Sequence, residues 1–425
     1  MCYNRSISGR GGSISDMQHK YTFLFLSEKG FLTVLFGTLF LLGSHFLDYY
    51  PWIFFTVVLF LIDWKQVTAY ESVLAATLFI SMYVIWYMLD PTIAHRAGLF
   101  VGQGALAVLM FLLGRSLVSR YQSTALPVKP FFYSLFLFFI AYMLTLVYSY
   151  LFVEQNRVLS SWGMHVCFPN EYARININGG NLISTILAYY LAPMAILTPF
   201  ILFYWGKLQK EKFHTIELIA LLALSLFALF LAAEMGRRTV MLLFAFSFVY
   251  LSVFRLKSYM TIMDRKRLWG IALLLVALTG IGVYLLLDTP AMQRLLLKGF
   301  DDVRFGWWSQ GLQAMIDYPW GGGYDVIVGN RTKLAHNVWI DMGKDYGIIP
   351  FIILILFSAS LAYRFFSFLF FSKADIVLKH LVFLMGVVIF SIFMIEPVFN
   401  SDKTFFIYAM YFFGIITILG NKKYG

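Results

Sequence analysis

The fold is decided by one polar interval, residues 288–347, which reads DTPAMQRLLLKGFDDVRFGWWSQGLQAMIDYPWGGGYDVIVGNRTKLAHNVWIDMGKDYG. Long apolar runs flank this interval, and Gly347 opens the second of them. Binding and catalytic residues are disproportionately placed on loops that a rigid scaffold positions. We therefore expect this interval to be a loop that carries the chemistry of the protein.

The composition indicates a membrane protein. Hydrophobic residues make up 60% of the 425 residues and charged residues only 13%, whereas soluble chains typically carry about 25% charged residues. We predict an all-α, polytopic integral membrane protein. The net charge of +11 is explained by Lys and Arg on cytoplasmic loops, so no nucleic-acid partner is expected.

Twelve apolar runs come near the roughly 20 residues that a membrane-crossing helix needs. They are residues 31–47, 51–62, 72–89, 97–118, 130–153, 181–205, 215–233, 239–255, 268–287, 347–371, 376–395 and 404–419. The chain then divides into an inner tail (1–30), nine helices (31–287), a large outer loop with short helices (288–346), and three helices with an inner tail (347–425). The second run is short, and a re-entrant segment there is the alternative.

The distribution of basic residues supports this topology with both termini inside. It places 21 of the 33 Lys and Arg residues on the inner side, as the positive-inside rule requires. Arginines on the outer side run against that rule, so we single out Arg174, Arg237, Arg238 and Arg304 as functional candidates.

Arg237 and Arg238 stand in a turn between two predicted helices, three and four residues after Glu234. They are either a snorkelling pair in contact with that glutamate or a fork of guanidinium groups that clamps a phosphate or diphosphate. Arg304 lies in a segment with helical spacing of apolar residues and two tryptophans, Trp307 and Trp308, typical of a helix at the membrane interface. Its guanidinium either meets lipid headgroups or is a second cation for the same diphosphate.

The remaining polar features of the loop are a glycine run and a histidine. Gly321 to Gly323 form a turn, and their backbone N–H groups are a candidate contact for an anionic oxygen; no P-loop lysine follows. His336 is either a solvated loop histidine or a general base, since imidazole titrates near neutral pH. Cys2 and Cys167 lack metal-ligand spacing, so no zinc site is indicated. The sequence also has no HExxH, DxD or Asp/Glu cluster that would hold Mg²⁺, so neither a metal nor a cofactor is expected.

Taken in order, these motifs resemble the O-antigen ligase and polymerase superfamily. The resemblance covers roughly residues 234–371 and consists of the arginine turn, Arg304 with Trp308, Pro319-x-Gly321-x-Gly323, and His336-Asn337 before a hydrophobic helix. It implies a glycosyltransferase of the bacterial inner membrane whose large loop and active face are periplasmic and whose termini are cytoplasmic. Its donor would be a glycan on undecaprenyl diphosphate.

The resemblance also implies roles for individual residues. His336 would be the catalytic base, and Arg304 with Arg237 or Arg238 would hold the diphosphate, in a metal-independent, inverting transfer. Further candidates for substrate contact are Arg96, Arg174, Trp308, Gly321, Gly323 and Asn337. The acceptor would be lipid A-core in a ligase or a second lipid-linked glycan in a polymerase. We lean to the ligase, with a polysaccharide transporter or flippase as the alternative from another class.

Overall fold

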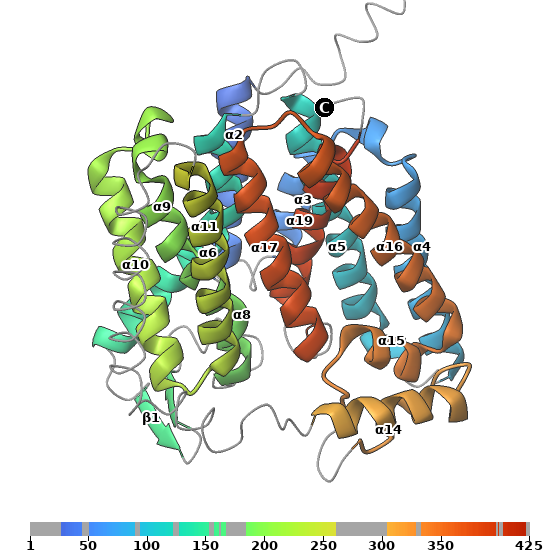
Figure 1. Ribbon diagram of the computed structural model, residues 1–425. Helices are drawn as coiled ribbons and strands as arrows, with labels where there is room; N and C mark the ends of the chain where they lie inside the picture. The colour runs from blue at the N-terminus through green and yellow to red at the C-terminus, as the bar shows by residue number, and fades with distance from the viewer. Residues whose placement is uncertain are drawn as a thin grey trace, which may run out of the picture.

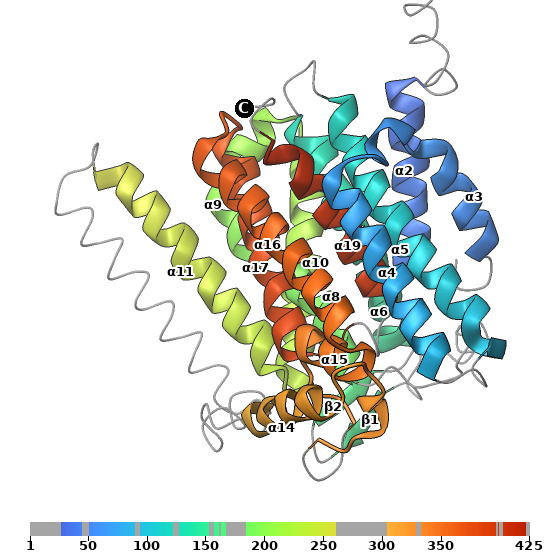
Figure 2. The same ribbon diagram turned by 90° about the vertical axis from the view of Figure 1, so that its right-hand side faces the viewer.

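The computed structural model describes residues 27–44, 51–89, 94–121, 127–152, 157–160, 163–166, 184–260, 304–328, 333–396, 398 and 403–421. In these ranges the chain forms a bundle of roughly upright helices with short elements across one end (Figures 1 and 2). The bundle helices are α2 (Glu28–Gly43), α3 (Pro51–Leu61), α4 (Tyr70–Leu89), α5 (Ala94–Arg120), α6 (Val128–Phe152), α8 (Ser184–Ala195), α9 (Leu197–Lys210), α10 (Thr215–Glu234), α11 (Arg238–Met260), α16 (Ile348–Phe371), α17 (Ile376–Ile395) and α19 (Lys403–Leu419).

Seven helical stretches in the described part of the chain are long and apolar enough to cross a membrane. They are Tyr70–Leu89, Gly102–Arg120, Val128–Tyr148, Tyr189–Lys210, Thr215–Glu234, Ile348–Phe371 and Ile376–Ile395, and Arg238–Phe254 and Thr404–Leu419 are shorter apolar helices. The predicted membrane character and helical class are therefore confirmed, whereas the count of twelve crossings stays a prediction.

The expected spans coincide with helices throughout the described residues. Eleven of the twelve runs overlap a bundle helix, and the ninth, residues 268–287, lies outside the described residues. The second run forms α3, of only 11 residues, consistent with its short apolar length. A two-stranded antiparallel hairpin of β1 (Arg157–Ser160) and β2 (Gly163–Val166) adds a small element that an all-α prediction did not contain.

The sixth expected run is not one continuous helix. It is divided into α8 and α9 at Ile196. Pro193 lies inside α8 and Pro199 inside the first turn of α9. Proline has no N–H to donate to the carbonyl four residues earlier, and its ring crowds that carbonyl. Two prolines six residues apart therefore account for the interruption.

Glycines set the closest helix contact described in the bundle. A Cβ at Gly114 of α5 would lie 2.0 Å from the carbonyl oxygen of Tyr411 in α19, and a Cβ at Gly414 would lie 1.9 Å from that of Phe111. The two backbones therefore touch at reciprocal positions, the packing that small residues permit between membrane helices. This contact holds α19 in the middle of the fold, next to α5.

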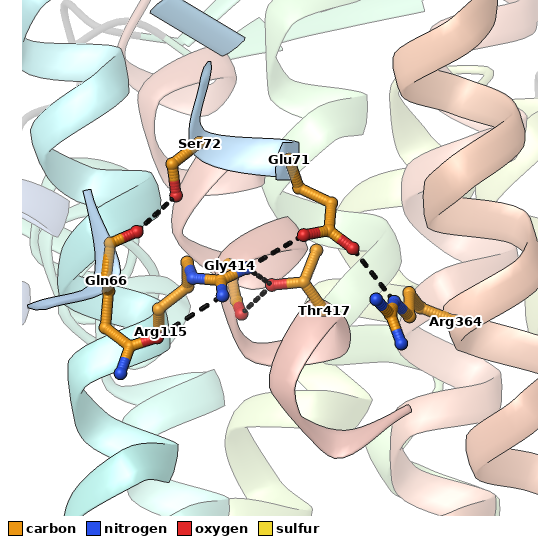
Figure 3. A network of polar contacts seen from close by, with 7 residues as sticks. All are labelled: Gln66, Glu71, Ser72, Arg115, Arg364, Gly414 and Thr417. Atoms are coloured by element: carbon orange, nitrogen blue, oxygen red, sulfur yellow. Dashed lines mark hydrogen bonds and ion pairs between the residues drawn. The ribbon is translucent and has the colours of Figure 1, made fainter. Parts of the chain in front are cut away.

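A buried ionic network joins four helices (Figure 3). The Glu71 carboxylate of α4 lies 2.9 Å from Nε of Arg364 in α16 and 3.5 Å from Nη1 of Arg115 in α5. Arg115 also donates to Oγ1 of Thr417 in α19, at 2.8 Å, and to Oε1 of Gln66, at 3.3 Å. A buried carboxylate needs such partners, because an unpaired charge in an apolar interior costs several kcal/mol.

The short elements lie together at one end of the bundle. Helix α14 (Arg304–Asp317) runs across that end, and α15 (Val338–Tyr346) and the β1–β2 hairpin lie there too. The described C-terminal end of the chain is at the opposite end (Figure 1). The loop regions around residues 154–180 and 288–346, which the topology assigns to one face, thus share one end wherever they are described.

Candidate functional site

The site is built on the start of α15. Asn337 caps this helix: its Oδ1 accepts hydrogen bonds from the backbone N–H groups of Trp339 and Ile340, at 3.1 and 3.2 Å. Its Nδ2 donates to the carbonyl oxygen of Met394 in α17, at 3.3 Å. The buried Asn337 side chain is therefore occupied in starting α15 and tying it to the end of α17, and these bonds explain it without a substrate contact.

His336 precedes this cap in a left-handed backbone conformation, with φ of 57°. Residues other than glycine adopt this region at a cost of order 1 kcal/mol or more, and such positions gather at functional sites. The buried Asp341 carboxylate offsets the cost of this backbone conformation. Its two oxygens accept hydrogen bonds from the N–H groups of Ala335 (2.6 Å) and Asn337 (3.2 Å). Both peptide flanks of His336 are thus fixed by one side chain.

Burial also changes the chemistry of Asp341. Removal from water raises the pKa of its carboxyl to about 6, against the lowering effect of the two backbone hydrogen bonds; Asp345 raises it and Lys344 lowers it. The loop under His336 is therefore held by a group that titrates slightly below neutral pH.

Helix α14 packs closely against α15. A Cβ at Gly311 of α14 would lie 2.6 Å from the side chain of Ile340, and a Cβ at Gly343 of α15 would lie 2.3 Å from that of Met315. This contact brings the first turn of α14 to His336. The ring of Trp307 lies 5.0 Å from the imidazole, centroid to centroid, with the planes tilted by 35°, so an indole covers the histidine.

The guanidinium of Arg304 and the imidazole of His336 meet at a third residue, Glu396. This residue follows the last turn of α17, and its carboxylate is only 4% exposed. Nη2 of Arg304 lies 2.9 Å from Oε1 of Glu396, and Nδ1 of His336 lies 3.6 Å from Oε2. The carboxylate therefore stands between the guanidinium and the imidazole that the sequence singles out.

The glycine run has a packing role. Gly321 and Gly322 have φ of 93° and 94°, backbone conformations that favour glycine. A Cβ at Gly321 would lie 2.9 Å from the backbone of Tyr346, and one at Gly323 would lie 2.7 Å from the carbonyl oxygen of Lys344. These contacts account for the glycines, and a contact of Gly321 and Gly323 with substrate stays a prediction.

The same turn is tied to α15 by a fully buried lysine. Nζ of Lys344 donates to the carbonyl oxygen of Gly323, at 2.8 Å, and pairs with the carboxylate of Asp345. The N–H of Gly322 donates to the carbonyl oxygen of Asp345, at 3.0 Å. The turn after α14 and the end of α15 therefore form one packed unit.

The other predicted residues are placed as follows. Arg237 precedes and Arg238 begins α11, and both are half-buried. Helix α11 starts at the end of the bundle where α14 lies (Figure 2). Trp308 makes an edge contact with Phe305, at 5.3 Å between ring centroids, and its buried Nε1 has no hydrogen-bond partner in the described residues. Arg96 lies in α5, with its side chain outside the described residues, as is all of Arg174. Convergence of the arginines of the turn with Arg304 stays a prediction.

Sequence reasoning missed two carboxylates of this site, Glu396 and Asp341. Glu396 had a usable signal, because it ends a 20-residue helix whose last three turns have no charged residue. Ionisable residues at membrane depth are expensive and are functional candidates by default. Asp341 lies five residues after His336, and its hydrogen bonds to the peptide flanks become visible only in three dimensions.

Comparison with known proteins adds no assignment. No protein-family model matches the chain, and no curated protein is significantly similar to it. The family resemblance and the roles that it implies therefore stay predictions.

Proposed function

We propose that this protein is a glycosyltransferase of the O-antigen ligase type. It moves a glycan from undecaprenyl diphosphate to a hydroxyl group of lipid A-core at the periplasmic face of the bacterial inner membrane. The observation that carries the proposal is the approach of Arg304 and His336, 32 positions apart, to the two oxygens of the buried Glu396 carboxylate. A cation and a base side by side at the end of an apolar bundle suit a substrate with an anionic head and a long hydrocarbon tail.

The reaction divides between these groups. The imidazole of His336 takes the proton of the acceptor hydroxyl while its oxygen forms a bond to the anomeric carbon, with inversion. The bond from that carbon to the diphosphate oxygen breaks, and the electron pair leaves with the diphosphate. Arg304, with Arg237 or Arg238, stabilises the charge that develops there, since guanidinium groups bind phosphate oxygens in a bidentate manner.

The proposed topology places this chemistry outside the cytoplasm. Twelve crossings with both termini cytoplasmic put the loop of α14 and α15, the turn at Arg237, and the end of α17 on the periplasmic side. Support comes from the common location of these elements at one end of the bundle, opposite the described C-terminal end (Figures 1 and 2). The lipid-linked donor would then reach the site from the outer leaflet.

The test is transfer by the purified protein in vesicles that contain a glycan on undecaprenyl diphosphate and lipid A-core. The wild type should transfer the glycan to lipid A-core. In His336→Ala and in Arg304→Ala the rate of this transfer should fall by at least about a hundredfold. His214→Gln is the matched control. This exposed histidine caps the first turn of α10, at the end of that helix away from Arg237 and Arg238.

The product separates the proposal from its alternatives. Longer lipid-linked glycan in place of glycosylated lipid A-core would make the protein a polymerase. Movement of lipid-linked glycan across the vesicle membrane without a new glycosidic bond would make it a transporter. Full transfer by His336→Ala would end the proposed mechanism.

A further inference from the structure

The contact between Glu396 and His336 is incomplete. Oε2 of Glu396 and Nδ1 of His336 are both buried, face each other at 3.6 Å, and have no hydrogen-bond partner in the described residues. A hydrogen bond between nitrogen and oxygen needs about 2.7–3.2 Å. Two buried polar atoms left unsatisfied at such a short separation are unfavourable, because each loses its bonds to water.

The other oxygen of the same carboxylate is well paired. Oε1 of Glu396 takes the guanidinium of Arg304 at 2.9 Å. The proposed reaction, on which this inference rests, requires Arg304 to bind the diphosphate of the carrier. Glu396 would then exchange its partner, and among the described residues the ring nitrogen Nδ1 of His336 faces its other oxygen, at 3.6 Å.

We infer that Glu396 is a positioning residue that couples carrier binding to activation of His336. Without the carrier, Glu396 holds Arg304. When Arg304 turns to the diphosphate, the carboxylate moves by about 0.5 Å and accepts the Nδ1–H of His336. This bond fixes the proton on Nδ1, which leaves the lone pair on Nε2 for the hydroxyl proton.

The proton balance of the exchange is complete. The hydroxyl proton moves to Nε2 and makes an imidazolium, whose positive charge the Glu396 carboxylate stabilises. The carboxylate accepts the Nδ1–H bond and does not take the proton, as in catalytic triads. The imidazolium then gives this proton to the departed diphosphate or to water, which restores the neutral base.

The surroundings of His336 favour a movement of Glu396 over a movement of the histidine. Asp341 holds the backbone on both sides of His336, and Trp307 covers its ring. The charged or titratable groups identified around the ring are Arg304 from α14, Glu396 from the end of α17 and Asp341 from α15. The ring is therefore held while the carboxylate has two alternative partners.

The wild type provides a test that needs no substitution at Glu396. Nuclear magnetic resonance of protein labelled with ¹⁵N-histidine is recorded before and after addition of undecaprenyl diphosphate, with the His336→Gln variant assigning the signals. We expect a downfield Nδ1–H proton of His336, typical of a ring bonded to a carboxylate, only after the carrier is added. Undecaprenol, which has the same tail without the diphosphate, should leave the signal unchanged.

Kinetics of the Glu396→Gln variant provide the second test. We expect kcat for glycan transfer to fall about a hundredfold with the KM of the lipid-linked donor unchanged or lower, because Arg304 is released. Glu396→Asp should recover part of the rate, since it restores the charge. A purely structural residue would lower the amount of folded protein with kcat per folded molecule unchanged.

The outcomes separate this inference from the proposed function. If undecaprenyl diphosphate binds and His336→Ala is inactive, but the Nδ1 signal does not respond or Glu396→Gln keeps its kcat, the coupling by Glu396 is wrong and the proposed function stands. If the wild type does not bind the carrier, the proposed function fails, and the inference fails with it.

Discussion

The carboxylate of Asp341 accepts a hydrogen bond from the N–H of Asn337, at 3.2 Å, and its other oxygen accepts one from the N–H of Ala335. One side chain therefore fixes the main chain on both sides of His336. This is an indirect role, because Asp341 acts on the backbone and not on the ring.

Replacing Asp341 with Asn should reduce transfer without removing the protein from the membrane. The two N–H groups bond to different carboxylate oxygens, and the amide replaces one of these oxygens with an NH₂ donor. One N–H therefore loses its acceptor, and the left-handed backbone at His336 is released. We expect a loss of about ten- to a hundredfold in kcat with little change in donor KM. Asp317→Asn, at the exposed end of α14, is the control, and wild-type kcat in Asp341→Asn would contradict this role.

The raised pKa of Asp341 predicts a pH dependence of stability. Its folded value of about 6 lies above the usual 3.8, so the folded protein binds the proton more tightly than the unfolded chain does. The stabilisation is complete below about pH 4 and is lost as the pH rises through about 6. We subtract the unfolding free energy of Asp341→Asn from that of the wild type. This difference should increase by up to about 3 kcal/mol when the pH is lowered from 7 to 4. Parallel thermal unfolding curves for the two proteins over this range would refute it.

The crossing of α5 and α19 predicts opposite effects for two glycine substitutions. Gly414→Ala places a Cβ against the backbone of Phe111, which cannot move without shifting a helix, and should destabilise by about 1–3 kcal/mol or more. Gly206→Ala in α9 meets no atom within 4 Å and should be neutral or stabilising by up to about 1 kcal/mol. Thermal unfolding in detergent, followed by size-exclusion chromatography, measures both, and equal stability of the two variants would contradict the contact.

The Glu71 network predicts a large effect from a single charge. Glu71→Gln leaves the guanidinium groups of Arg115 and Arg364 without their counter-charge, and we expect a loss of about 3 kcal/mol in unfolding free energy. Asp325→Asn is the matched control, since it breaks an ion pair with Lys333 that is exposed and should cost less than about 1 kcal/mol. A Tm for Glu71→Gln within the range of the control would show that the network does not stabilise the bundle.

The arginine turn predicts a difference between its two members. Conservative substitution to lysine keeps the charge but removes the bidentate geometry. Of Arg237→Lys and Arg238→Lys, the one that replaces the diphosphate ligand should lose transfer by about tenfold or more, and the other should stay near the wild-type rate. Two variants with wild-type rates would remove this turn from the proposed site.

The helices were predictable because apolar length is a direct physical requirement of a bilayer. Each expected run within the described residues coincides with a helix, and the interruption at Ile196 had a signal in Pro193 and Pro199 that length alone does not reveal. Orientation and the number of crossings follow from charge rules and stay predictions.

The site was predictable only in part. His336 and Arg304 stood out because polar residues are rare in this chain, but their shared partner Glu396 is 60 positions from His336. Sequence does not specify which helix ends meet, because that depends on how the whole bundle packs. Asn337 had a clear local signal, since an asparagine before a helix is a common N-cap, and this explains it without substrate.

Gly347, with φ of 85°, is the single residue between α15 and α16 and caps both helices. Its Cβ position is filled by the backbone of Trp320, and the N–H of Ile348 donates to Pro319 at 2.8 Å. Helix α15, which begins just after His336, is therefore fixed rigidly to α16, a helix long enough to cross a membrane. Lipids with longer or shorter acyl chains change the tilt of such a helix. A change in the tilt of α16 should move the imidazole of His336, so the transfer rate should vary with bilayer thickness.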